Sequence, residues 1–291
     1  MGTRTECADN RLVSEYLSWQ TDVRRRQPLT IASYRSTLDC WCHWLQHHDY
    51  WLAGASLEDL EAFLMRPRQK RGRGTTGAVA THRRETATIR GFYRWACSRG
   101  HIETDPMLEA MAPSLKPRQP RPLSDKLWLQ AWDTDLPDGV RSALGLGFFC
   151  GLRRAEIVAL GCHQLTDRRI VEFVRKGGGE DTLPWRSLVQ VYETHLGHLQ
   201  PERFLEALGK QRRHATHITP FRDPDWLNRI IHKYDLGFTP HMLRHSCATN
   251  LIRAGVPLPI VSRMMNHSAI TTTMLYVKAG GDELRDWLRP E

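Results

Sequence analysis

The stretch with the densest chemistry in this sequence is HMLRHSCATNLIRAG, residues 241–255. His241 and Arg244 are three residues apart, so they share one face of a helix that Gly255 suits as a cap. His245 directly follows Arg244, so we expect its side chain one position further round the helix. Backbone N–H groups at the start of a helix also point toward any bound anion. The stretch therefore predicts an anion-binding helix start.

Two further stretches offer matching side chains. In GLRRAEIVAL, Arg153 follows a Gly-Leu turn and Glu156 comes three residues later. In MMNHSAITTTMLYVKAG, Tyr276 lies nine residues after His267. Singly, each has an ordinary explanation, such as a surface ion pair for Arg153 and a half-buried core position for Tyr276. Together with the first stretch, they favour one shared site.

These residue types suit displacement at phosphorus. The reaction gathers negative charge on the equatorial oxygens, and planar, permanently charged arginines such as Arg153 and Arg244 can clamp those oxygens bidentately. Preorganised donors of this kind are worth about 3 to 4 kcal/mol each in barrier height. Two nearby guanidinium groups favour the phenolate of Tyr276, which makes a weak nucleophile usable. Because arginines supply the positive charge, this chemistry needs no metal.

The same stretches resemble the sequence boxes of the tyrosine recombinases, the phage-integrase family that includes the Xer proteins. GLRRAEIVAL resembles the first arginine box, HMLRHSCATNLIRAG the second, and MNHSAITTTMLYV the box with the nucleophile. The resemblance is specific over residues 150–278. It implies a catalytic set of Arg153, Lys176, His241, Arg244, His267 and the nucleophile Tyr276, supported by Glu156.

Roles follow from the resemblance. Tyr276 would attack a DNA phosphodiester and form a 3′-phosphotyrosyl bond, with Arg153 and Arg244 on the non-bridging oxygens. Lys176 would protonate the leaving 5′-hydroxyl. The turn holding it departs from the Gly-Lys-Gly pattern of the family, so Arg175 remains a competing acid.

The histidines and the acid complete the implied site. His241 would handle the tyrosine proton or support the phosphate, His267 would hydrogen-bond the phosphate, and Glu156 would orient the other side chains. Asn266 stands where the family often has Gly. Asn tolerates a left-handed backbone better than most residues, so we expect the turn to survive.

Composition agrees with a nucleic-acid partner. The 291 residues carry a formal net charge of +9 and are 41% hydrophobic, which indicates a globular, basic protein. Seven cysteines without framework spacing favour a reducing compartment, and no apolar segment suits export or a membrane span. We expect a cytoplasmic protein without cofactor. The cluster Cys40 to His43 lacks a second ligand pair at zinc spacing, so no metal is expected.

The elements that position the site fall into two predicted domains. Residues 1–110 read as a bundle of four helices, and 111–123 as a proline-rich, basic linker. The resemblance implies that the bundle is of the SAM-like kind that binds core DNA sites. Residues 124–291 read as a catalytic domain. The fold class is mainly α with a small antiparallel β-sheet, because 170–184 has the pattern of a hairpin inside helical sequence. The chain would end in an amphipathic helix.

Basic residues of the first domain and the linker predict contacts with DNA phosphates, which set affinity more than sequence choice. The expected contacts are Arg66, Arg68, Lys70, Arg71, Arg73, Arg83, Arg84, Arg90, Lys116 and Arg118.

The resemblance implies a compact site-specific recombinase, without an arm-binding domain, that acts on double-stranded DNA as a tetramer. The C-terminal helix would pass to a neighbouring protomer or pack on its own domain, and an accessory factor is a further expected partner. A type IB topoisomerase is the nearest alternative. A metal hydrolase is disfavoured because Met242 stands where HExxH places its glutamate. A silent DNA-binding protein is disfavoured by the intact catalytic set.

Overall fold

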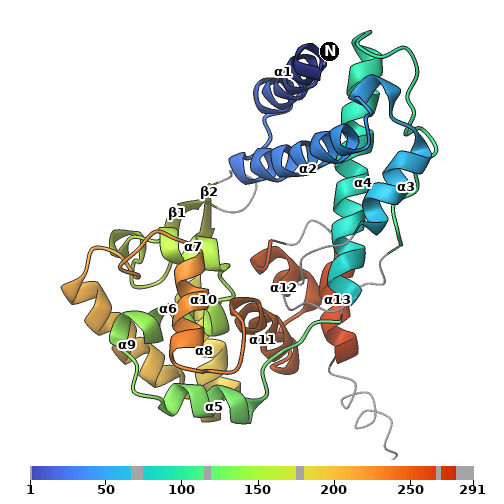
Figure 1. Ribbon diagram of the computed structural model, residues 1–291. Helices are drawn as coiled ribbons and strands as arrows, with labels where there is room; N and C mark the ends of the chain where they lie inside the picture. Colours follow the sequence, from blue (N-terminus) through green and yellow to red (C-terminus); the bar gives the residue numbers. More distant parts are fainter. Residues whose placement is uncertain (1, 67–74, 115–118, 175–179, 267–269, 280–291) are drawn as a thin grey trace, which may run out of the picture. The chain divides into compact units, whose positions relative to one another are not determined.

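The computed structural model describes residues 2–66, 75–114, 119–174, 180–266 and 270–279 (Figure 1). The chain divides into two compact units, Met1–Pro117 and Arg118–Glu291. The division falls inside the segment 111–123. The fold is mainly helical with one small antiparallel sheet, as expected. Among the described residues, none of the helices combines the length and apolarity that crossing a membrane would require.

The first unit contains a bundle of helices, as the spacing of its apolar residues predicts. Its elements are α1 (Gly2–Asp22), α2 (Pro28–His47), the 3-10 helix η1 (Leu52–Gly54), α3 (Leu57–Met65) and α4 (Thr75–Ser98). Helix α3 begins with a capping box, formed by the Ser56 hydroxyl and the Asp59 carboxylate. Gly100, just after the end of α4, has a left-handed φ of 73°.

Aromatic side chains form the core of this bundle. Trp41 donates a hydrogen bond to the Tyr93 hydroxyl at 3.2 Å, and that hydroxyl donates to the Leu52 carbonyl at 2.9 Å. Both rings are fully buried. Because buried Trp and Tyr polar atoms need partners, this chain of bonds fixes α2 and α4 against the turn at η1.

The second unit holds the remaining elements. They are α5 (Asp125–Asp133), α6 (Asp138–Cys150), α7 (Arg154–Ala159), η2 (Cys162–Gln164), β1 (Ile170–Val174), β2 (Glu180–Leu183), α8 (Trp185–His195), η3 (Gly197–Leu199), α9 (Pro201–His214), α10 (Asp225–Lys233), α11 (Pro240–Arg253), α12 (Leu258–Met264) and α13 (Ile270–Ala279).

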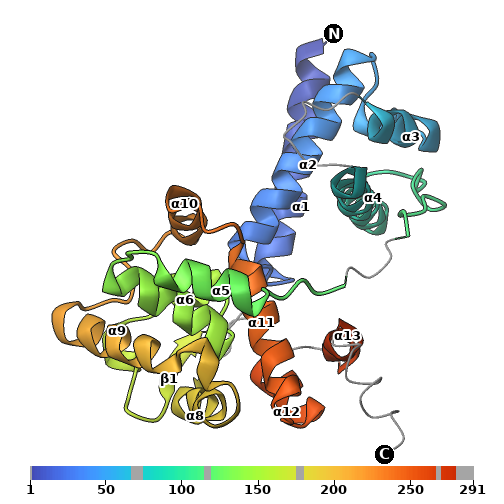
Figure 2. The same cartoon turned by 90° about the horizontal axis from the view of Figure 1, so that it is seen from below.

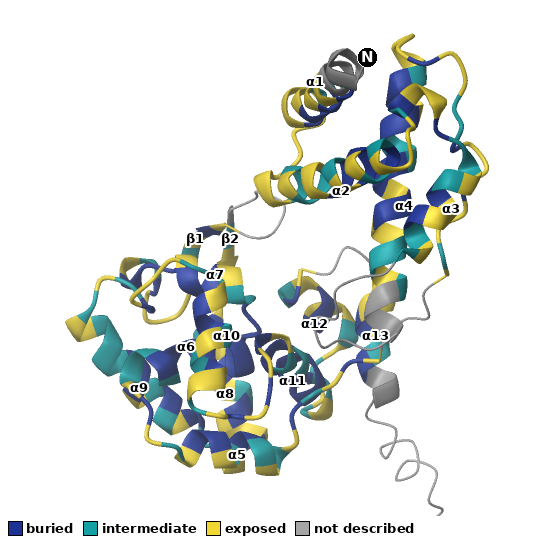
Figure 3. Cartoon of the chain, in the orientation of Figure 1, coloured by how far each residue is buried: buried dark blue, intermediate teal, exposed yellow. Residues whose placement is uncertain are grey.

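Helix α6 is the centre of this unit. It packs against α9 and α11 and is buried along most of its length (Figure 3). At Gly145 an added Cβ would overlap the Phe204 ring, so only glycine allows α9 this close. The helix ends at Gly151, whose left-handed φ of 69° turns the chain into α7. Helices α11, α12 and α13 follow in sequence and pack against one another (Figure 2).

The predicted hairpin is present. Strand β1 pairs antiparallel with β2, from Ile170 opposite Leu183 to Val174 opposite Glu180. A register shift lies between Ile170 and Phe173, where Glu172 has a left-handed φ of 51°. This is the geometry of a β-bulge. Lys176 and Arg175 lie outside the described residues.

Candidate active site

Arg153 is held by the residue three positions after it. The Gly151 turn delivers Arg153 to the N-cap of α7, and Glu156 lies in the first turn of that helix. One carboxylate oxygen of Glu156 accepts from Arg153 Nη1 at 2.9 Å, and the other accepts from the Arg153 backbone N–H at 2.8 Å. Glu156 is buried, so this pairing restricts the guanidinium group strongly.

Arg244 joins three segments. It is only 6% exposed, and its two Nη atoms donate to the backbone carbonyls of Gly151 and Met265. Burial, together with the nearby charge of Arg153, lowers the pKa of Arg244 to about 10, so the group still carries its charge at neutral pH. Next to Met265, Asn266 has a left-handed φ of 46°, which confirms the expectation for this turn, and its carbonyl lies 3.5 Å from Arg153 Nη2. Both arginines therefore converge on the turn after α12.

Tyr276 lies on α13, facing α11. Its side chain is 4% exposed, and its hydroxyl is 2.8 Å from Nδ1 of His245. The ring centroids of these two residues are 5.5 Å apart. The hydroxyl is thus fixed by the helix that also carries Arg244.

Burial and the two arginines act on the pKa of Tyr276 in opposite directions. Arg244 and Arg153 do lower its pKa, as expected, but burial is the larger effect and raises the pKa above its ordinary value. Tyr276 is therefore a neutral phenol here. Burial, with the charges of His241 and Arg244, also lowers the pKa of His245 to about 4, so its imidazole is neutral at physiological pH.

His245 is the site residue that sequence reasoning missed. It was expected one step round from His241, yet a spacing of four residues places both on one helix face. Their ring centroids are 6.4 Å apart. The i, i+4 spacing was the available signal. The sequence did not reveal where α13 packs, and it is this packing that places Tyr276 next to His245.

The structure therefore brings most described members of the implied set together in the second unit. These are Arg153, Glu156, Arg244 and Tyr276, with His241 next to His245. His267 and Lys176 lie outside the described residues, as does the predicted C-terminal helix in 280–291.

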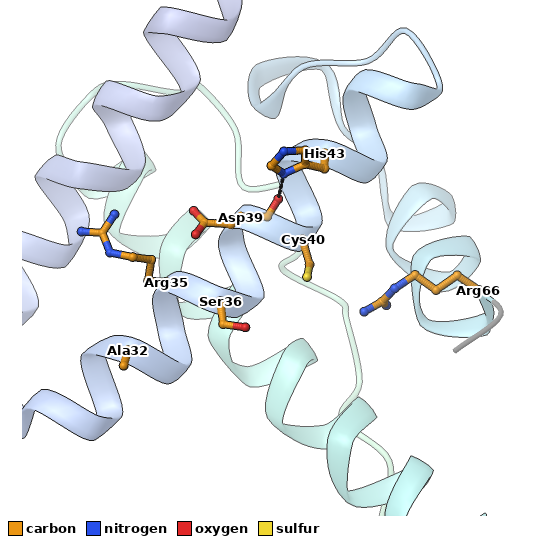
Figure 4. Close-up of a pocket in the computed structure, with 7 residues that line it drawn as sticks. All are labelled: Ala32, Arg35, Ser36, Asp39, Cys40, His43 and Arg66. Carbon is orange, nitrogen blue, oxygen red and sulfur yellow. Dashed lines mark hydrogen bonds between the residues drawn. The ribbon is translucent and has the colours of Figure 1, made fainter. Parts of the chain in front are cut away.

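Among the expected DNA contacts, Arg66 has partners within its own unit. Its guanidinium group binds the buried Glu85 at 3.0 Å and lies over the Phe63 ring at 3.5 Å. With Arg35 and His43 of α2 it also lines a hollow (Figure 4). Arg83 and Arg84 are exposed on α4, and Arg90 is half-buried. The remaining expected contacts lie outside the described residues: Arg68, Lys70, Arg71, Arg73, Lys116 and Arg118.

The cluster Cys40 to His43 lies on α2, with Cys40 exposed and Cys42 buried, so the two thiols do not share a face. In the part of the chain that the structure describes, no group of three or more His, Cys, Asp or Glu side chains is arranged to hold a metal ion.

Two family models match the chain. The phage integrase family model matches residues 129–281, which is more than half of the sequence, and the phage integrase N-terminal SAM-like domain matches residues 13–100. The chain is 29% identical to tyrosine recombinase XerD of Yersinia pestis, with 95% of each chain covered. It is 28% identical to tyrosine recombinase XerC of Roseiflexus castenholzii, covering 92% of this chain and 88% of that one.

Solved structures share the fold. A lambda integrase dimer (residues 75–356) bound to a COC′ core site has a TM-score of 0.69 at 19% identity, covering 90% of this chain and 96% of that one. The Tn1549 transposon integrase in complex with a circular intermediate DNA has a TM-score of 0.62 at 15% identity, covering 96% and 99%. With the arginines, the buried acid and the tyrosine of the second unit, these matches give one conclusion: the chain belongs to the phage integrase family of tyrosine recombinases.

Proposed function

We propose that this protein is a site-specific DNA recombinase that cleaves and rejoins duplex DNA through a 3′-phosphotyrosyl bond to Tyr276. The observation that carries the proposal is the convergence of Arg153, Arg244 and Tyr276, which come from three separate stretches of sequence. Such convergence suits one phosphorus atom, two cationic clamps and one nucleophile.

The arginines stabilise charge that develops on phosphorus. Arg153 and Arg244 bind the non-bridging oxygens of the scissile phosphate, where preorganised donors act most strongly because no reorganisation is needed. His241 handles the proton of the attacking phenol or supports the phosphate.

The bond changes balance within the site. The Tyr276 oxygen bonds to phosphorus while the bond from phosphorus to the 5′-oxygen breaks. Lys176, or Arg175 in its place, gives that oxygen a proton, and His267 hydrogen-bonds the phosphate. The covalent bond conserves the energy of the phosphodiester, so a 5′-hydroxyl can reverse the step without ATP. The arginines supply the charge that metal ions supply elsewhere, so we propose metal-independent catalysis.

The partner in this proposal is double-stranded DNA. The net charge of +9 suits a polyanion, and related folds have been solved as lambda integrase bound to a core site and as a lambda integrase tetramer bound to a Holliday junction. We propose a tetramer on DNA, joined through the C-terminal segment, with an accessory factor as a further partner. The first unit would contact phosphates through its basic residues.

The experiment begins with a library of nicked duplexes of randomised sequence, incubated with the full chain in EDTA. Covalent adducts are recovered, sequenced and resynthesised as a defined substrate. Wild-type protein should form the adduct, Tyr276→Phe should form none, and Arg153→Ala or Arg244→Ala should be slower by at least about 100-fold. Exchange of strands between two such duplexes supports a recombinase. Relaxation of supercoils without exchange would instead support a type IB topoisomerase.

A further inference from the structure

We infer that His245 is a positioning residue for the nucleophile: its Nδ1 accepts the hydrogen bond of the Tyr276 hydroxyl and so sets where the attacking oxygen points. The inference rests on the proposed function, because it assigns Tyr276 as the nucleophile. It gives a specific task to a histidine that the implied catalytic set does not contain.

The contact is direct and well defined. Nδ1 of His245 and the Tyr276 hydroxyl oxygen are 2.8 Å apart, and the two rings are tilted by 44° to one another. The tyrosine is 4% exposed and His245 is half-buried, so water competes little for this bond. Thr273, one helical turn before Tyr276, is fully buried, which anchors the same face of α13.

The charge states reduce this contact to one between a neutral phenol and a neutral imidazole. Burial keeps Tyr276 a protonated phenol, and His245, with a pKa of about 4, is a neutral imidazole at physiological pH. A neutral imidazole has one nitrogen that accepts and one that donates. The proposed hydrogen bond requires the tautomer in which the phenol donates to Nδ1 and the ring proton of His245 resides on Nε2. In the opposite tautomer Nδ1–H would donate to the phenol oxygen, and the NMR measurement below distinguishes the two.

The position of His245 is tied to the phosphate clamp. It directly follows Arg244, whose guanidinium group binds the Gly151 and Met265 carbonyls. Two adjacent residues of α11 therefore provide the cation that binds the phosphate and the hydrogen-bond acceptor for the nucleophile. A helix fixed at this point keeps the distance between the two constant, which is what a near-attack geometry requires.

The charge environment argues for positioning over proton transfer. The basic groups beside His245 are Arg244 and His241 on its own helix, and Tyr276 faces it from α13. Burial and both neighbours disfavour a proton on His245, so it serves as the acceptor of a hydrogen bond and not as a base.

Two substitutions separate these roles. Asn places its Oδ1 near the position of Nδ1 and accepts a hydrogen bond, but it cannot take a proton, whereas Ala does neither. With saturating substrate in a single turnover, His245→Ala should form adduct about 10- to 100-fold more slowly, with DNA affinity changed less than about twofold. His245→Asn should recover most of the wild-type rate. His232→Ala, at an exposed histidine of α10, is the matched control.

Two results would overturn the inference. One is a His245→Ala protein that reacts as fast as wild type. The other is a His245→Asn protein as slow as His245→Ala, because that would make the proton, not the position, the contribution of His245.

A measurement without DNA separates this inference from the proposed function. In 15N-histidine NMR of the full chain, the His245 signals, assigned through His245→Asn, should show an unprotonated Nδ1 whose shift changes in Tyr276→Phe. A protonated Nδ1 would contradict the inference directly. If wild-type protein forms no adduct with any duplex in the library, the proposed function fails, whatever the NMR shows.

Discussion

Glu156 binds Arg153 at two points at once, the guanidinium group and the backbone N–H, at 2.9 and 2.8 Å. The acid is buried while the arginine remains partly accessible. A buried carboxylate in this place cannot rotate away without losing both bonds. The pair therefore presents one cation to the site in a fixed direction.

The first prediction concerns that pair. Glu156→Gln keeps the shape but removes the charge that restrains Arg153, so adduct formation should slow by about 10-fold or more, in line with the loss of outer partners at other sites. Single-turnover cleavage measures it. Glu193→Gln, which removes the ion pair with the partly exposed Arg186, should react like wild type. Equal rates for Glu156→Gln and wild type would show that Arg153 needs no such support.

The second prediction concerns the end of the linker segment. The Leu123 N–H donates to the Ser246 hydroxyl at 2.8 Å, and that fully buried hydroxyl donates to the Met242 carbonyl. Ser246→Ala leaves the Leu123 N–H without its acceptor, which should cost about 1 to 3 kcal/mol of unfolding free energy. Urea unfolding measures this cost. A variant as stable as wild type would mean that another acceptor takes over the bond.

The third prediction separates two arginines of the first unit. Arg66→Ala should lower stability, because it leaves the buried Glu85 without its cation. Arg84→Ala, at an exposed position on α4, should instead weaken DNA binding and reduce its salt dependence by about one phosphate contact. Arg11→Ala, at an exposed residue paired with Glu15, is the control for both. Binding isotherms at several salt concentrations measure DNA affinity, and unfolding curves measure stability. The assignment would be contradicted if Arg66→Ala weakened only DNA binding and Arg84→Ala lowered only stability.

The fourth prediction concerns pH. The folded protein lowers the pKa of His245 to about 4 from an ordinary 6.5, so protons bind the unfolded chain more readily. The contribution of neutral His245 to stability is complete above about pH 6.5 and is lost as the pH falls toward 4. As the pH falls from 6.5 toward 4, wild type should therefore lose stability relative to His245→Asn. Other titrating groups cancel in this difference. A difference that stays constant from pH 7 to pH 4.5 would contradict the lowered pKa.

Local features of the fold were predictable because local sequence determines them. Ser56 with Asp59 forms a helix start, Gly151 ends α6 in a left-handed turn, and Asn266 adopts the left-handed conformation that glycine would otherwise provide. Each depends on residues within about one turn of helix, and so does the proximity of Arg153 to Glu156.

The state of the site was not predictable in this way. The pKa of Tyr276 depends on how deeply α13 packs, and burial there exceeds the effect of the arginines. The partner of its hydroxyl, His245, is separated from it by 31 positions in sequence. The spacing of residues along one helix predicts which face of the helix a side chain lies on. It does not predict which other element packs against that face.

The most direct test of the account is to locate the covalent bond. After reaction with the selected nicked duplex, nuclease and trypsin digestion should leave nucleotide mass on the peptide of residues 264–278, whose single tyrosine is Tyr276. We predict fragmentation spectra that place the modification on that tyrosine, and no modified peptide from Tyr276→Phe. Nucleotide mass on any other residue of the wild-type protein would contradict the central claim.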